Sequence, residues 1–175
     1  DIRCEKLTFS KRQQGGGSVM VWAAISNNDR TDIVFVDGTL DSIKYQEIMG
    51  QYMLQKLRPS SIYQQDNARP YVSMSTNQWM ESHNVSLLKW PSISPDLNPI
   101  ENVWGLLTRQ VYANSKQYGS INELKVAIKR CWRQLPQSSI SGLIGGMSNR
   151  IFNCIVKKVP SNINKSNSKL FGEFV

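Results

Sequence analysis

The order of apolar and polar positions divides the chain into short apolar runs and longer amphipathic stretches. Residues Val19 to Ile25 are almost continuously apolar, which predicts a central strand covered on both faces. The turn residues Asn27 to Asp29 precede a second apolar run at Ile33–Val36, so the two runs are expected to form a hairpin. Further strands are predicted at Ile62–Gln65 and Val85–Trp90, with a short candidate strand at Leu7–Ser10.

Between these runs, the apolar residues repeat at the spacing of amphipathic helices. Asp41 is placed to cap a helix reaching about Leu57, and Arg58-Pro59 ends it. Ser120 with Glu123 is the signature of a capping box. The remaining helices are predicted at about Tyr71–Ser82, from Asn98 to Ala113, from Ser120 to Leu135, and from Ser139 to Met147, with a continuation from Asn149 to Lys158. Strands that alternate with helices in this way predict an α/β fold.

Two acidic residues stand at the ends of such elements. Asp66 directly follows the predicted strand Ile62–Gln65, and Glu101 lies in the first turn of the helix after the proline-containing loop Pro91–Asn98. The 34 residues between them suffice for a helix, a strand and a loop. Because parallel strands joined by a helix end at the same edge of a sheet, this path can bring both carboxylates to one edge.

Two neighbouring carboxylates without a basic partner suit a hard divalent cation such as Mg²⁺. A pair of such ions flanking a phosphate supports phosphoryl transfer. A structural interpretation stays open, because Asn98, Pro99 and Glu101 also match the N-cap, N1 and N3 positions of a helix. Asp66-Asn67 likewise matches a turn. Spacing alone favours these structural roles over metal binding.

Four segments, in the same order, resemble Tc/mariner transposases. They are GGGSVMVWAAIS, IYQQDNARPY, LLKWPSISPDLNPIENVWGLL and MSNRIFNCIVKK, and the resemblance extends from about Gly15 to Lys158. It implies a ribonuclease-H-like catalytic domain in which three acids bind two Mg²⁺ or Mn²⁺ ions and act on DNA. By this resemblance Asp66 is the second acid and Glu101 the third, both catalytic and both metal ligands, in the branch of the family that ends in Glu.

The first acid and its strand are expected to be missing, because only 14 residues precede Gly15. Asp32 and Asp37 flank a strand that the resemblance places elsewhere in the sheet, and Tyr71 stands where relatives commonly carry His. The expected fold is therefore an α/β, ribonuclease-H-like mixed sheet flanked by helices, lacking the first strand, with extra C-terminal helices. Residues 1–158 are expected to form an N-terminally truncated catalytic domain, and residues 159–175 a flexible tail.

The charge is concentrated in the C-terminal part of the chain. The net charge is +8; residues 1–107 contain 10 Lys or Arg and 11 Asp or Glu, whereas residues 108–175 contain 11 and 2. A basic surface attracts polyanions, although basic helices can also serve solubility alone. The candidate DNA-binding residues are Lys125, Lys129, Arg133, Lys157 and Lys158. Three scattered cysteines and one histidine argue against a zinc site.

Two functions are therefore compared. The first is a fragment of a transposase catalytic domain that cleaves and joins DNA strands by metal-dependent phosphoryl transfer. Its expected partners are transposon-end and target DNA and a second copy of the chain in a homodimer, with no membrane, and its expected location is the nucleus. The second is a catalytically inactive module that binds nucleic acid or pairs with another subunit. An incomplete set of carboxylates favours the second function for a chain that acts alone.

Overall fold

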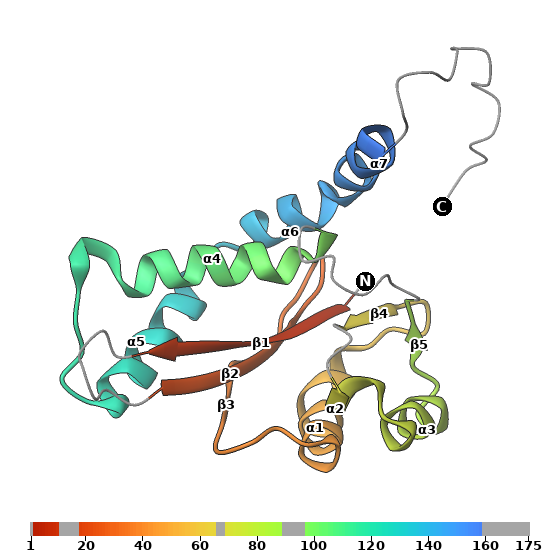
Figure 1. Cartoon of the computed structure of the whole chain (residues 1–175), viewed down its shortest axis with the longest axis horizontal. Helices are drawn as coiled ribbons and strands as arrows, with labels where there is room; N and C mark the ends of the chain where they lie inside the picture. The colour runs from red at the N-terminus through yellow and green to blue at the C-terminus, as the bar shows by residue number, and fades with distance from the viewer. Residues whose placement is uncertain (1, 11–17, 66–68, 89–96, 159–175) are drawn as a thin grey trace.

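The computed structural model describes residues 2–10, 18–65, 69–88 and 97–158. They form a five-stranded mixed sheet with helices on both faces (Figure 1). The strands are β1 (Ile2–Ser10), β2 (Ser18–Ile25), β3 (Val34–Val36), β4 (Ile62–Gln65) and β5 (Ser86–Leu87). Their order across the sheet is β3-β2-β1-β4-β5. The pairs β1–β2 and β2–β3 are antiparallel, whereas β1–β4 and β4–β5 are parallel.

The expectation that the first strand is missing is wrong. β1 is the middle strand of the sheet, and it pairs with β2 from Arg3↔Ile25 to Ser10↔Ser18. On its other side it pairs with β4. The first half of β1 carries Arg, Glu and Lys and shows little strand character before Leu7. Two neighbouring strands that satisfy its backbone groups outweigh that weak local preference.

The predicted helices are present, with two of them divided. The described helices are α1 (Ser42–Ile48), α2 (Arg69–Val72), α3 (Met74–Ser82), α4 (Pro99–Val111), α5 (Ile121–Gln134), α6 (Gln137–Gly145) and α7 (Met147–Lys158). Asp41 caps α1 as predicted, but the helix continues as a π-helix at Met49–Met53 and a 3₁₀ turn at Leu54–Lys56. The predicted helix Tyr71–Ser82 is interrupted at Ser73, because the Ser73 side chain caps α3.

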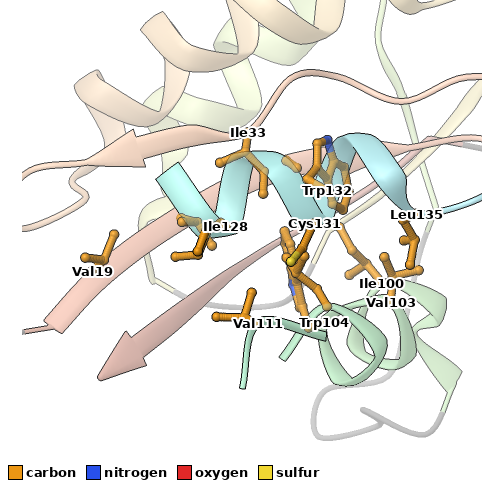
Figure 2. Packing of buried hydrophobic residues seen from close by; sticks show 14 of the residues in the cluster. Val19, Ile33, Ile100, Val103, Trp104, Val111, Ile128, Cys131, Trp132 and Leu135 are labelled. Atoms are coloured by element: carbon orange, nitrogen blue, oxygen red, sulfur yellow. The ribbon is translucent and has the colours of Figure 1, made fainter. Parts of the chain in front are cut away.

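The sheet separates two hydrophobic cores. On β2, Val19, Val21, Ala23 and Ile25 belong to the core under α4 and α5, whereas Trp22 and Ala24 belong to the core under α1. This explains the continuous apolar run, since a strand covered on both faces needs apolar side chains at every position. In the first core the rings of Trp104 and Trp132 lie 5.6 Å apart between α4 and α5 (Figure 2).

The C-terminal helices, predicted as additions to the fold, are tied to the turn between β2 and β3. The Arg30 guanidinium donates to the carbonyl of Leu135 at 2.6 Å, and the Trp132 indole donates to the carbonyl of Thr31 at 2.9 Å. In α6, the Gln137 side chain donates to the carbonyl of Ser26 at 3.0 Å. These bonds hold α5 and α6 against the sheet.

None of the helices that the structure describes has the length and apolar character needed to span a membrane.

Candidate active site

The end of β4 is fixed by hydrogen bonds on the α1 side of the sheet. Gln65, the last residue of β4, accepts a hydrogen bond from the Tyr45 hydroxyl at 2.9 Å and donates one to the carbonyl of Tyr71 at 2.9 Å. Tyr45 comes from α1 and Tyr71 from α2. Asp66, the predicted second acid, follows Gln65 directly and lies outside the described residues. The residue that leads into Asp66 is therefore held at two points.

Gln64 lies on the opposite face of β4, the face that α4 covers. It is paired with Arg3, which is paired in turn with Ile25 of the core under α4 and α5. The Gln64 side chain is fully buried, and neither its amide oxygen nor its amide nitrogen has a hydrogen-bond partner among the described residues. Buried amides are normally satisfied, and an exception calls for a physical explanation such as an ion or a water molecule.

Glu101 is held at the start of α4 by the burial of its neighbours. Ile100, Val103 and Trp104 are almost completely buried, whereas Glu101 itself is partly exposed. The Asn98 side chain makes no capping hydrogen bond, so the structure does not support a capping box at this helix end. The two ion pairs within the described residues, Lys56–Asp29 and Lys125–Asp37, leave the Glu101 carboxylate without a basic partner.

The helix that carries Glu101 packs on the strand next to β4. α4 contacts β1, and β1 is parallel to β4. The proximity of Asp66 to Glu101 stays a prediction, because Asp66 lies outside the described residues. Among the residues that are described, no three His, Cys, Asp or Glu side chains form a metal cluster.

β1 contains no aspartate, and its acidic residue is Glu5. Glu5 is paired with Ala23, which belongs to the core under α4 and α5. The pairing of β1 with β4 ends at Cys4↔Gln65, so Glu5 is the first residue of β1 beyond it.

Tyr71, the residue that replaces a common His, is fully buried on the α1 side. Its ring centroid lies 4.2 Å from that of Tyr45. Tyr71 therefore packs in the core on the α1 face of the sheet, opposite to the face on which α4 and Glu101 lie. The roles of Tyr45 and Gln65 were not predicted from the sequence. Their signal is two polar residues ending an otherwise buried strand, but the sequence does not reveal their partners.

Three of the five candidate DNA-binding residues form a stripe along α5. Lys125, Lys129 and Arg133 follow one another at four-residue intervals, which places them on one face of a helix. The ammonium groups of Lys125 and Lys129 lie 5.2 and 5.4 Å from the centre of the Phe35 ring. Lys129 and Arg133 also line a pocket of about 210 Å³ beside Asp32, Ile33, Tyr52 and Trp132.

Lys157 and Lys158 end α7, and their side chains lie outside the description. Figure 1 shows α7 projecting beyond α6, at the end of the molecule away from the first turn of α5. The five candidate residues are thus divided between two places.

Comparisons with known proteins give the family. The family profile described as "DDE superfamily endonuclease" matches residues 4–125, a range that includes both Asp66 and Glu101. The chain belongs to this DDE superfamily. The Tc3 transposase of Caenorhabditis elegans is 39% identical to this DDE domain over 159 residues, which is 89% of the chain and 48% of Tc3. The Tc1 transposase of the same organism is 34% identical over 144 residues, covering 79% of the chain and 51% of Tc1.

The DDE domain therefore spans about half the length of these curated relatives. Among solved structures, the catalytic domain of Mos1 mariner transposase matches with a TM-score of 0.77 at 16% identity, over 89% of this chain and 80% of that one. A Mos1 paired-end complex with the left transposon end matches with a TM-score of 0.79 at 15% identity, over 89% and 54%. These matches confirm the expected ribonuclease-H-like fold and a DDE domain of the Tc1/mariner type.

Proposed function

We propose that this DDE domain is the catalytic domain of a DNA transposase, and that it cleaves and joins DNA strands by metal-dependent phosphoryl transfer. Asp66 and Glu101 would be its metal ligands. The observation that carries the proposal is a family match that spans both acids, in a fold where Glu101 at the start of α4 has no basic partner among the described residues.

The residues present suit a divalent cation of the Mg²⁺ or Mn²⁺ type. Carboxylate and amide oxygens are the ligands that these hard ions prefer. The partly exposed Glu101 offers such oxygens. On the same face of the sheet, the buried Gln64 adds an amide that has no hydrogen-bond partner among the described residues. Two bound ions would activate the attacking water or DNA 3′ hydroxyl and stabilise the charge that develops on the phosphate. Two matched Mos1 catalytic-domain structures contain raltegravir with Mn or Mg.

The role of the protein chain in this reaction is to hold and orient. The buried residues around Glu101 fix the start of α4, and the hydrogen bonds of Gln65 fix the end of β4. Rigid support of this kind places two ligands at a constant separation, which is what in-line displacement at a phosphate requires.

Transposon-end and target DNA are the proposed partners, contacted along the basic stripe of α5 and by Lys157 and Lys158. Phosphate contacts of this sort position DNA without reading its sequence. Several matched Mos1 structures are transposition complexes, including a strand transfer complex. We also propose that the protein acts as a homodimer and in the nucleus, where its DNA substrate would lie.

Metal titration tests the proposal. Mn²⁺ binding is measured by isothermal titration calorimetry for the wild-type domain and for Asp66→Asn, Glu101→Gln and Asp37→Asn. We expect loss of detectable binding in the first two variants. Asp37→Asn is the control, because the Asp37 side chain is exposed and pairs with Lys125 instead. Negligible binding by every protein, wild type included, would favour the catalytically inactive module.

A fourth variant, Glu5→Gln, extends the titration to β1. In the register of β1, Glu5 is paired with Ala23 of β2 and lies just beyond the pairing with β4. We expect weaker Mn²⁺ binding than in the wild type, with a smaller loss than for Asp66→Asn. Unchanged affinity would mean that β1 contributes no ligand.

The DNA contact is tested by the salt dependence of binding. Each phosphate contact removed should lower the slope of log K against log salt by about 1, so Lys129→Ala and Arg133→Ala should each show this reduction in fluorescence anisotropy titrations. Lys44→Ala is the matched control, since Lys44 lies on α1, on the other face of the sheet from α5. A slope that falls equally in all three variants would contradict a specific role for the stripe.

A further inference from the structure

We infer that Gln65 is a positioning residue, which holds the end of β4 and thereby Asp66 through its paired hydrogen bonds to Tyr45 and Tyr71. The inference rests on the proposed function, because it concerns the placement of a metal ligand. It assigns a role in that reaction to a side chain on the face of the sheet opposite to α4.

The contacts form a continuous buried chain. The Tyr63 and Tyr45 hydroxyls lie 2.9 Å apart, and the Tyr45 hydroxyl donates to the Gln65 amide oxygen at 2.9 Å. The Gln65 amide nitrogen then donates to the carbonyl of Tyr71 at 2.9 Å. Tyr45, Tyr63 and Tyr71 are fully buried, and Gln65 is 9% exposed. In such surroundings water competes little for these bonds, so each one restrains its partners strongly.

The hydrogen bonds of Gln65 bridge the two sides of the segment that contains Asp66. β4 ends at Gln65, and α2 begins at Arg69. The bond from Gln65 to Tyr71 joins the strand end to the helix that follows, and the bond from Tyr45 anchors both to α1. The chain positions on either side of residues 66–68 are thereby held together by one side chain.

The chemistry of Gln65 requires an amide. Its oxygen accepts from a hydroxyl while its nitrogen donates to a carbonyl, so each end of the group meets the complementary partner. A carboxylate would offer acceptors alone and would leave the Tyr71 carbonyl facing a negative charge. A thioether such as Met would fill similar volume with neither bond. Groups that hydrogen-bond directly to metal ligands change metal affinity by about 10- to 100-fold when they are removed. Gln65 acts through the backbone, so we expect an effect at the lower end of this range.

The test uses the whole domain with three variants and two measurements. Gln65→Met removes both bonds, and Tyr45→Phe removes the one that fixes the amide oxygen. Tyr63→Phe is the matched control, because it deletes a hydroxyl from the same buried chain and leaves both Gln65 bonds intact. The measurements are the Mn²⁺ dissociation constant and the hydrogen-exchange rate of residues 66–72 without metal, with melting temperatures recorded for each variant.

We expect a dissociation constant about tenfold higher for Gln65→Met, a smaller rise for Tyr45→Phe, and no change for Tyr63→Phe. Exchange of residues 66–72 should accelerate in the same order. The melting temperature should fall further in Tyr45→Phe, which breaks two bonds of the chain, than in Tyr63→Phe, which breaks one. Unchanged Mn²⁺ affinity in Tyr63→Phe despite its lower melting temperature would show that lost stability alone does not weaken binding.

The two proposals fail in different ways. Faster exchange in Gln65→Met, with no Mn²⁺ bound even by the wild type, would overturn the metal site and leave the restraint on this segment standing. Normal Mn²⁺ binding by the wild type, with Gln65→Met unchanged in both affinity and exchange, would overturn the positioning role. If Gln65→Met does not fold, the comparison of Tyr45→Phe with Tyr63→Phe decides in the same way.

Discussion

The two faces of the sheet hold the two ends of the candidate site by different means. On the α4 face, Glu101 is placed by apolar burial, with Trp104 of α4 packed on Trp132 of α5. On the α1 face, the strand end before Asp66 is placed by hydrogen bonds within a cluster of tyrosines around Gln65. Glu101 is thus carried by a helix that packs through its apolar face, whereas Gln65, the residue before Asp66, is held by directional bonds.

The two faces differ in how well they tolerate amino-acid substitutions. Apolar packing is non-directional, so a core adjusts to volume-conserving changes at small cost. Hydrogen bonds in a buried chain are directional, and removal of one partner leaves another group unsatisfied. Changes on the α4 face should therefore appear chiefly as lost stability. Changes in the Gln65 chain should appear chiefly as altered geometry at Asp66.

The largest effect is expected from the apolar face. Trp104→Ala removes a side chain that is 1% exposed and should lower the free energy of unfolding by about 3–5 kcal/mol. Urea denaturation measures this loss. Trp79→Ala on α3 is the control, because Trp79 is only partly buried and stacks on the neighbouring His83. Equal losses from the two substitutions would contradict the view that the buried Trp104 fixes α4 on the sheet more strongly than the peripheral Trp79 stabilises α3.

The second effect comes from the polar rim of the α4 face. Arg30 donates to the carbonyls of Leu135 and Arg133 and lies 5.4 Å from the Trp132 ring, and partial burial lowers its pKa while the charge of Asp29 raises it. Arg30→Ala should cost about 1–3 kcal/mol in urea denaturation, as expected for a bond made by a charged group. Arg30→Lys should recover part of this loss, since Lys keeps the charge without the forked geometry. No difference between Ala and Lys would assign the effect to packing alone.

A smaller effect is expected where α5 begins. The Ser120 hydroxyl accepts a hydrogen bond from the Glu123 backbone at 3.2 Å, and the Glu123 carboxylate accepts one from the Gly119 backbone at 2.8 Å. Ser120→Ala should lower the free energy of unfolding by about 1 kcal/mol. Ser120→Asp should keep most of the stabilisation that the cap provides, because Asp is also a good N-cap residue. A neutral Ser120→Ala would show that packing against α4 alone fixes the start of α5.

The smallest effect concerns pH. Burial raises the pKa of Asp29, but the hydrogen bonds from Lys56 and the Arg30 backbone and the charges of these two residues outweigh it, so that the pKa is lowered overall. A carboxyl with a lowered pKa stabilises the folded state above its unfolded pKa of about 3.9 and loses this contribution as pH falls through the folded value. The effect is small, because the pair with Lys56 is exposed to solvent.

Melting temperatures measured from neutral to acidic pH provide the test. Asp29→Asn should flatten the acid limb of the curve slightly, with Asp32→Asn as the control. A steeper limb in Asp29→Asn would contradict the assigned sign.

The elements that could be predicted are those whose own side chains determine them. β2 is apolar enough to be recognised alone, and Ser120 with Glu123 marks the start of α5. Only the Leu7–Ser10 end of β1 could be recognised, because the charged first half becomes a strand only between two partners. The break between α2 and α3 arises because the Ser73 side chain caps α3. The sequence pattern is equally compatible with an uninterrupted helix, so the break could not be predicted.

The candidate site divides along the same line. Glu101 could be placed at a helix start because Asn98 and Pro99 mark it locally. The Gln65 contacts could not be predicted, since Tyr45 lies 20 residues away along the chain and meets Gln65 only after α1 packs on the sheet. Contacts that depend on the assembled fold leave little trace in local sequence.

The ties between the β2–β3 turn and the C-terminal helices have a consequence for biogenesis. Their partners are 101 to 114 positions apart along the chain. Contacts of such long range form late and slow the folding reaction. While a ribosome is still making α5, the side chains of β2 that α5 will cover are still exposed to solvent. Partly synthesised chains with exposed strands tend to aggregate. Chaperone demand should therefore be greatest just before α5 and α6 emerge.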